Sequence, residues 1–164
     1  VVGELDHLPD TARFVVVCAD VRDPGNAGAV IRCADAAGAD AVVLAGDSVD
    51  PLNPKAVRST AGSLFHLPVI VHRDVTEVLD RLQAAGLQVL AADGAGTTGL
   101  HDADLDLAAP TAWLLGNEAW GLPADLSALA DRVVAVPIYG RAESLNLATA
   151  AAVCLYASAA ARHA

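Results

Sequence analysis

The chain has 164 residues, which is enough for one domain with a sizeable hydrophobic core. A hydrophobic content of 54% and a mean hydropathy of +0.44 exclude a disordered protein. The net charge of −10 argues against a general electrostatic attraction to nucleic acid. Because the N-terminal segment is acidic, we expect no signal peptide.

Short apolar segments alternate with helical patterns along the chain. Strands are predicted at residues 14–18, 41–44, 69–71, 87–91, 111–115 and 133–136. Helices are predicted at residues 27–37, after the Asn53-Pro54 pair, at 75–84, around Leu126 and at 145–161. Because the strands are apolar at nearly every position, both sheet faces must be covered. The pattern predicts an α/β fold with a largely parallel sheet and helices on both faces.

Three features argue against a membrane or metal function. The helix at 145–161 has no charged residue but is rich in Ala and polar side chains, so we expect a buried helix. The acidic repeat at 102–106 lacks the residues that complete a calcium loop, and it reads as a solvated loop. Cys18, Cys33 and Cys154 are too scattered for a zinc site, and we expect buried free thiols in a reducing compartment.

The first polar motif, DPGNAGAVIRCADAAGAD at residues 23–40, follows the first strand. A Pro-Gly turn leads into a helix that Asn26 is expected to cap. Arg32 lies off the apolar stripe of this helix, and its long side chain can reach back to the helix start. The alternative is a surface ion pair between Arg32 and Asp35. A dinucleotide-binding loop is a weaker alternative here, because GNAG is not G-x-G-x-x-G. It is also a weaker alternative for DGAGTTG at residues 93–99, which follows a strand but has no clear helix after it.

Two further polar turns follow later strands. In LLGNEAWGLP, residues 114–123, Glu118 stands among apolar neighbours and needs a partner. In VPIYGRAESLNLATA, residues 136–150, Ser144 and Asn146 mark the start of the last helix. Helix N-termini carry unpaired N–H groups that can donate hydrogen bonds to polar ligand atoms. Either turn alone is also compatible with an ordinary connection.

Taken together, the three segments resemble the motifs of one known family. They are N-x-G-x-x-x-R from Asn26 to Arg32, G-N-E-x-x-G from Gly116 to Gly121, and P-I-x-G-x-x-x-S-L-N from Pro137 to Asn146. Their order and spacing are similar to those of the SpoU/TrmH RNA ribose 2′-O-methyltransferases of the SPOUT superfamily. The similarity covers residues 13–160, and the segment at 53–62 resembles the family's K-x-x-R-x-S-x-G.

The resemblance implies a C-terminal trefoil knot, a homodimer that uses the apolar last helix, and a cytoplasmic enzyme. The family commonly carries an N-terminal RNA-recognition domain. Since the sequence also contains no Met, we expect residues 1–12 to be a linker remnant and residues 13–164 to be the catalytic domain. S-adenosylmethionine is the implied cofactor, and its implied contacts are Gly116, Val136, Ile138, Gly140 and Leu145.

The resemblance also assigns candidate catalytic and RNA-binding residues. Arg32 would position or activate the ribose 2′-hydroxyl, and Asn26 and Ser144 would hold the ribose or phosphate. Glu118 and Asn146 would hold Arg32 and the knot loop in place. The implied contacts to RNA phosphates are Arg22, Lys55, Arg58 and Arg141.

The sequence thus predicts transfer of a methyl group from S-adenosylmethionine to a ribose 2′-hydroxyl of structured RNA, with ribosomal RNA favoured over transfer RNA and no metal required. The alternative is a non-catalytic RNA-binding or assembly module with the same fold. Trp113 and Trp120 flank the second motif, where core packing is the simplest role, although Trp120 is also suited to stacking on a base.

Overall fold

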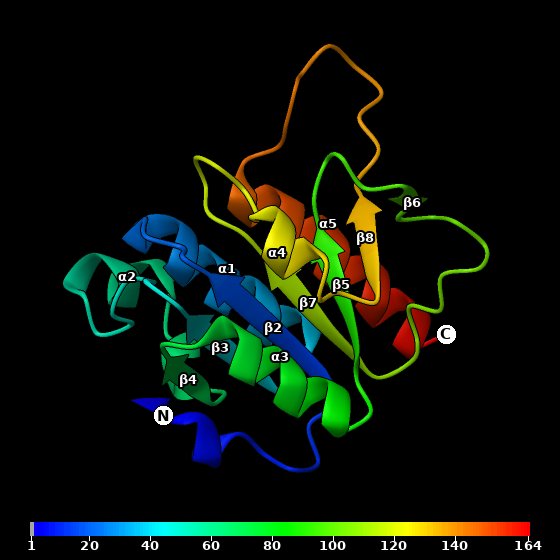
Figure 1. Ribbon diagram of the computed structural model, residues 1–164. Helices are drawn as coiled ribbons and strands as arrows, with labels where there is room; N and C mark the ends of the chain where they lie inside the picture. The colour runs from blue at the N-terminus through cyan, green and yellow to red at the C-terminus, as the bar shows by residue number, and fades with distance from the viewer. Residues whose placement is uncertain (1) are drawn as a thin grey trace.

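The computed structural model describes residues 2–164 and contains one eight-stranded sheet with the order β1-β4-β3-β2-β7-β5-β8-β6 (Figure 1). The strands are β1 (Val2–Gly3), β2 (Phe14–Ala19), β3 (Ala41–Ala45), β4 (Val69–His72), β5 (Gln88–Ala92), β6 (Thr98–Gly99), β7 (Thr111–Leu115) and β8 (Arg132–Ala135). Every pairing between named strands is parallel. The predicted α/β class and parallel sheet are confirmed.

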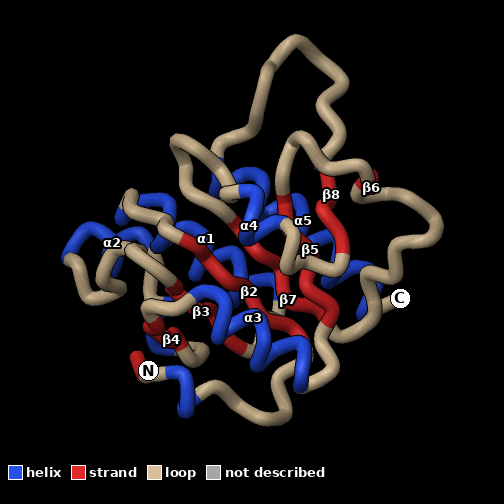
Figure 2. Tube along the Cα trace, viewed as in Figure 1, coloured by secondary structure: helices blue, strands red, loops and turns tan. Residues whose placement is uncertain are grey.

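The sheet lies between two layers of helices (Figure 2). The helices are α1 (Pro24–Ala37), α2 (Pro54–Ser59), α3 (Val75–Ala84), α4 (Ala124–Ser127) and α5 (Leu147–Arg162), with 3₁₀ turns η1 (Leu5–His7) and η2 (Ser63–Phe65). One core cluster joins α1 and α5 to one face of the sheet, and a second joins α3 to the other face. Both faces are therefore covered, as the continuous apolar character of the strands predicts.

The central strand β2 shows how the sequence divides between these two layers. All six of its residues are buried. Phe14, Val16 and Cys18 belong to the cluster with α1 and α5, whereas Val15 and Val17 belong to the cluster with α3. The period-two alternation of a strand thus supplies both cores from one apolar run.

Helix α5 is fixed to the sheet by a buried polar contact as well as by apolar packing. The indole Nε1 of Trp113 on β7 donates a hydrogen bond to Ser158 Oγ on α5 over 2.9 Å. Both residues are completely buried. Trp113 is therefore a core residue. Within residues 2–164, no helix is long and apolar enough to cross a membrane.

Helix starts and short strands differ from the sequence prediction. Asp23, not Asn26, caps α1: its Oδ2 accepts from the Asn26 backbone N–H over 2.7 Å. The last helix begins at Leu147 with Asn146 as its N-cap, two residues after the predicted start. The strands β1 and β6 were not predicted, since two residues are too few to show a periodicity.

The segment expected as a linker remnant contributes to the domain. Within residues 2–12, β1 pairs with β4 at the sheet edge, and Leu5, Leu8 and Ala12 are buried in the core cluster that contains α3. The trefoil knot that the family resemblance implies concerns how the chain is threaded, and it stays a prediction.

Candidate active site

A pocket of about 280 Å³ lies where β5, β7 and β8 end at their carboxyl edge. It is lined by Ala92, Asp93, Gly94, Gly116, Asn117, Glu118, Ala119, Gly121, Val136, Ile138, Glu143, Ser144, Leu145, Leu147 and Ala150. Ligands of α/β proteins bind outside the carboxyl ends of parallel strands, where loops from different strands meet. The second and third sequence motifs therefore meet in one cavity.

The pocket contains most of the residues predicted to contact a cofactor. Gly116, Val136, Ile138 and Leu145 line it, whereas Gly140 does not. Gly140 lies on the exposed segment between β8 and α5, which projects from the body of the domain (Figure 1), and no atom approaches a Cβ built on it.

A third wall of the pocket was missed from the sequence. Ala92, the last residue of β5, lines it together with the next two residues, Asp93 and Gly94. The signal was present, since an acidic residue and a glycine follow a buried strand, but that segment was considered only as a poor dinucleotide loop.

All of the charged residues that line the pocket are acidic. Asp93, Glu118 and Glu143 are among its lining residues, and none of those residues is basic. The remaining lining is apolar side chains and glycine backbone. Such a wall favours a ligand with a flat apolar part and a positive charge.

The turn Asn117–Gly121 explains the glycines of the second motif. Asn117 and Gly121 form an antiparallel bridge, with N···O distances of 3.0 and 2.8 Å. A Cβ on Gly116 would lie 2.4 Å from the Gly121 carbonyl carbon, and Gly121 itself has a φ of 69°. Only glycine fits both positions without strain. The Asn117 side chain then donates to the Asp20 carbonyl over 2.7 Å, which ties the turn to the end of β2.

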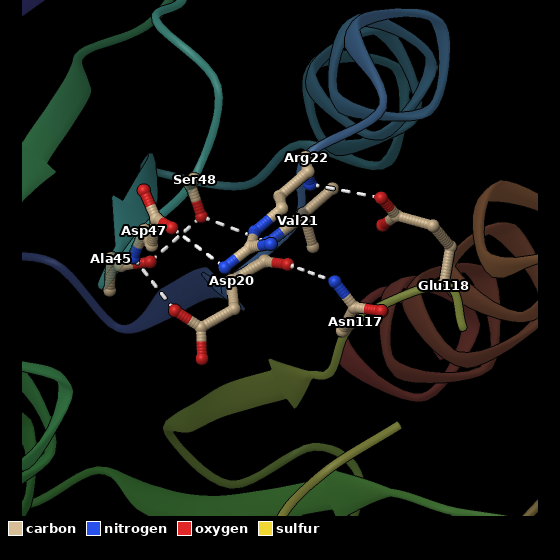
Figure 3. A network of polar contacts seen from close by, with 8 residues as sticks. All are labelled: Asp20, Val21, Arg22, Ala45, Asp47, Ser48, Asn117 and Glu118. Atoms are coloured by element: carbon tan, nitrogen blue, oxygen red, sulfur yellow. Dashed lines mark hydrogen bonds and ion pairs between the residues drawn. The ribbon is translucent and has the colours of Figure 1, made fainter. Parts of the chain in front are cut away.

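Glu118 has partners, but they are not the predicted one. One carboxylate oxygen accepts from the backbone N–H groups of Arg22 and Asp23 over 3.0 and 2.8 Å. Figure 3 shows Glu118 reaching toward Arg22 across the gap between the two loops. Glu118 and Asn146 are predicted to hold Arg32 and the knot loop in place, and no contact between Glu118 and Arg32 is found among residues 2–164. Glu118 holds the loop before α1 instead, because two adjacent backbone donors there point at one carboxylate.

Asn26 and Asn146 connect the first motif to the third. The Asn146 amide Nδ2 lies 3.3 Å from Asn26 Oδ1, across 120 residues of sequence. The Asn146 Oδ1 accepts from the backbone N–H groups of Ala148 and Thr149. A single amide therefore caps α5 with its oxygen and contacts α1 with its nitrogen.

Arg32 is exposed on α1, and no polar contact of its guanidinium is found among residues 2–164. The alternative ion pair with Asp35 is absent there too. Asp35 Oδ2 instead accepts from Ser63 Oγ and pairs with His66 Nδ1, both over 2.7 Å. These two hydrogen bonds lower the pKa of Asp35. Arg32 is thus left available for a ligand.

The other predicted basic residues fall into two groups. The Arg22 guanidinium pairs with Asp47 over 2.7 Å and lies 5.1 Å from the centre of the Trp120 ring. Lys55, Arg58 and Arg141 are exposed. Asn53 caps the short helix α2, as predicted, and α2 carries Lys55 and Arg58.

Helix α2 is packed directly against α1 at the glycine of the first motif. A Cβ on Gly28 would lie 2.4 Å from Ser59 Cβ and 2.5 Å from the Ala56 carbonyl oxygen. The missing side chain allows α2 to approach α1, so that Lys55 lies near Gly25 at the start of α1. The basic side chains of α2 are thereby held near the start of α1.

No cluster of His, Cys, Asp or Glu suited to a metal is found in the described part of the chain, residues 2–164. The acidic repeat has local roles: Asp102 and Asp106 accept from nearby backbone N–H groups, and Asp104 pairs with Arg132 over 2.9 Å. The cysteines are free; Cys18 and Cys154 are buried, and Cys33 is half-buried. The prediction of buried free thiols agrees with the structure for Cys18 and Cys154, whereas Cys33 is less buried than expected.

The fold and the pocket define a class of protein: an α/β domain with a pocket at the carboxyl edge of a parallel sheet. Residues 13–156 match the model of the SpoU rRNA Methylase family, and the chain belongs to that family.

Named relatives agree with this assignment. The chain is 43% identical over 154 residues to the 23S rRNA (guanosine(2553)-2′-O)-methyltransferase RlmP of Bacillus subtilis (strain 168), with 92% of this chain and 61% of the relative covered. It is 40% identical over 160 residues to the 23S rRNA (uridine(2479)-2′-O)-methyltransferase of Streptomyces viridochromogenes, with 93% of this chain and 55% of the relative covered.

Solved structures show the same fold. The SpoU methyltransferase AviRb from Streptomyces viridochromogenes, in complex with the cofactor AdoMet, superposes with a TM-score of 0.89 and 38% identity. The match covers 98% of this chain and 65% of that one. The chain therefore spans 55–65% of the length of these three proteins.

Proposed function

We propose that this domain transfers a methyl group from S-adenosylmethionine to a ribose 2′-hydroxyl of RNA, with 23S ribosomal RNA as the favoured substrate. The observation that carries the proposal is the convergence of three motifs at one place. The loop before α1, the turn Asn117–Gly121 and the start of α5 are joined there by the contacts of Glu118 and Asn146. The substrate is favoured because two curated relatives are named 23S rRNA 2′-O-methyltransferases.

The pocket suits S-adenosylmethionine on its own chemistry. The carboxylates of Asp93, Glu118 and Glu143 favour a cationic sulfonium, and Val136 and Leu145 offer apolar surface to a flat adenine ring. Gly116 contributes backbone alone to the pocket lining. When bound, this cofactor supplies the methyl group, and a relative with the same fold is described in complex with it.

The chain's own residues are then responsible for orientation. Displacement at a methyl carbon needs donor and acceptor in line, so positioning of the ribose is the main requirement. Arg32, which is free of intramolecular polar contacts in residues 2–164, would hold the target nucleotide by its phosphate or 2′-oxygen. A guanidinium stays protonated, so we assign it positioning and electrostatic stabilisation rather than proton abstraction.

The other candidate residues surround this position. Ser144 lines the pocket with an exposed hydroxyl, and Asn26 lies within reach of Asn146. We assign Ser144 and Asn26 to the ribose or phosphate of the target, and Glu118 and Asn146 to holding the loops that carry them. Lys55, Arg58 and Arg141 remain proposed phosphate contacts on an otherwise acidic domain, whereas the guanidinium of Arg22 is already paired with Asp47.

Two features of the assembly are part of the proposal. The segment 136–146 between β8 and α5 would form the knot of the family around the cofactor. A homodimer would bury the exposed face of α5, where Val153 is 38% and Tyr156 is 52% exposed one turn apart. Sedimentation of the protein tests the dimer, and a monomer at micromolar concentration would contradict it. We place the activity in the cytoplasm with its ribosomal substrate.

Calorimetry with S-adenosylhomocysteine and a methyl-transfer assay on ribosomal RNA test the activity. The Arg32→Ala variant should bind S-adenosylhomocysteine as the unmodified protein does, but transfer at least about 100-fold more slowly. Arg73→Ala, at an exposed arginine after β4, is the matched control and should leave both measurements unchanged.

The outcomes separate the alternatives. Cofactor binding without transfer to any RNA would favour the non-catalytic module. A folded protein that binds no S-adenosylhomocysteine would refute the proposal as a whole, and full activity in Arg32→Ala would remove Arg32 from its assigned role.

A further inference from the structure

We infer that Trp120 and Arg22 form a stacking platform for an unpaired RNA base at the rim of the pocket. This inference rests on the proposed function, since it takes RNA as the ligand. It adds a contact to the base itself, whereas Lys55, Arg58 and Arg141 are assigned to the phosphate backbone.

Trp120 is exposed, although its neighbours in the same turn line the pocket. Glu118, Ala119 and Gly121 line the pocket, but Trp120 does not. Its side chain therefore points outward from the same turn, and the residue is 54% exposed. The other tryptophan, Trp113, is fully buried and hydrogen-bonded, so core packing does not explain Trp120.

The ring is supported from one side. The Arg22 guanidinium carbon lies 5.1 Å from the ring centre, within the range of a cation–π contact. Such a contact uses one face of the indole. With more than half of the residue exposed, the opposite face remains accessible for another planar group.

Arg22 is itself held in three ways. Asp47 Oδ2 binds its Nη2 over 2.7 Å, Glu118 accepts from its backbone N–H, and Trp120 covers its guanidinium (Figure 3 shows the first two contacts). The backbone N–H of Trp120 in turn donates to Asn117 Oδ1 over 3.2 Å. The two planar groups are therefore held in place before a ligand arrives, which lowers the entropic cost of binding.

The chemistry selects a base rather than a phosphate. The positive charge of Arg22 is already paired with Asp47, and the domain carries a net charge of −10. Stacking on an aromatic face needs no net charge, and unpaired bases in RNA loops are commonly recognised in this way. The position beside the pocket implies a base close to the target nucleotide.

Binding of two short RNA probes tests the platform without any methyl donor. One is an end-labelled oligoadenylate, and the other is an abasic ribose–phosphate oligomer of the same length. We expect the protein to bind oligoadenylate more tightly than the abasic oligomer. Trp120→Ala should weaken oligoadenylate binding on the order of ten-fold and leave abasic binding unchanged.

Control variants separate stacking from general surface effects. Phe65→Ala removes a more exposed aromatic side chain, 76% exposed, on η2 near the other end of α1, and should change neither affinity. Trp120→Phe keeps an aromatic face and should recover part of the lost affinity. Quenching of intrinsic fluorescence by oligoadenylate should disappear in Trp120→Phe, since the remaining Trp113 is buried.

The results that overturn the platform are distinct from those that overturn the methyltransferase. Equal affinity of the unmodified protein for both probes, or an unchanged oligoadenylate affinity in Trp120→Ala, refutes the platform. Neither result touches S-adenosylhomocysteine binding or methyl transfer, which are measured on the same preparations. Trp120→Ala should also bind S-adenosylhomocysteine normally, and a loss there would mean that the ring supports the pocket instead.

Discussion

Removing the hydroxyl of Ser158 should destabilise the domain by leaving the Trp113 indole N–H without a partner. The contact is 2.9 Å long and completely buried, so water cannot replace the lost acceptor. An unsatisfied buried donor costs about 1–3 kcal/mol, whereas the single atom removed leaves little cavity. For a domain of this size, each 1 kcal/mol lowers the melting temperature by about 2–4 °C. Ser158→Ala should therefore melt about 2–12 °C lower than the unmodified protein.

The two partners of this hydrogen bond differ in whether they have another partner within reach, and this makes Ser158 the better position for testing the bond. A serine hydroxyl in a helix can turn to a carbonyl oxygen of the preceding turn, but the indole N–H has no such choice. In the Trp113→Phe background, Ser158→Ala should consequently cost much less than in the unmodified protein. Urea unfolding followed by circular dichroism measures both costs and gives the coupling energy as their difference.

Ser127→Ala serves as the control, because Ser127 lies in the short helix α4 and is only partly buried. It should change the free energy of unfolding by less than about 0.5 kcal/mol. If Ser158→Ala is equally harmless, or if its cost is the same with Phe at position 113, the hydrogen bond does not stabilise α5 and the reasoning is wrong.

Two further predictions concern titratable groups. Burial raises the pKa of both Cys18 and Cys154 to about 12. The folded protein should therefore react with a thiol reagent at pH 8 at Cys33 alone, and the denatured protein at all three cysteines. Labelling of Cys18 in the native state, located by mass spectrometry, would contradict this. The lowered pKa of Asp35 stabilises the fold above the ordinary aspartate pKa of about 4, and this contribution is lost as the pH falls below it. The pH dependence of unfolding should accordingly flatten between about pH 5 and pH 3 in Asp35→Asn, and an unchanged slope would show that the His66 contact is not formed in solution.

The sequence predicted the strands well because they are short apolar runs between turns. The bounds of α3 and β7 were predicted to the residue, and β8 was displaced by one. Helix starts were less accurate, since two neighbouring side chains can both act as caps. Asp23 and Asn26 compete at α1, and the residue before Pro24 has the extended backbone that a cap needs.

The sequence identified residues that lie in the candidate site, but it did not predict which groups they contact. The motifs identified Glu118 and Asn146, yet the partners of Glu118 are backbone N–H groups nearly 100 residues away in the chain. Backbone donors leave no trace in a sequence, because any residue can supply them. The wall after β5 was missed for a similar reason: its role depends on β8 and β7 lying on either side of β5, which no local pattern encodes.

The contact between Asn26 and Asn146 has a consequence for how the protein is made. A ribosome synthesises the first motif long before the third, so the emerging chain can form β2, β3 and α1 while the candidate site is still incomplete. Closing so distant a contact is entropically slow and comes late in folding. The proposed cofactor affinity should then appear only once the last helix has formed, which makes it a reporter of closure between the first and third motifs.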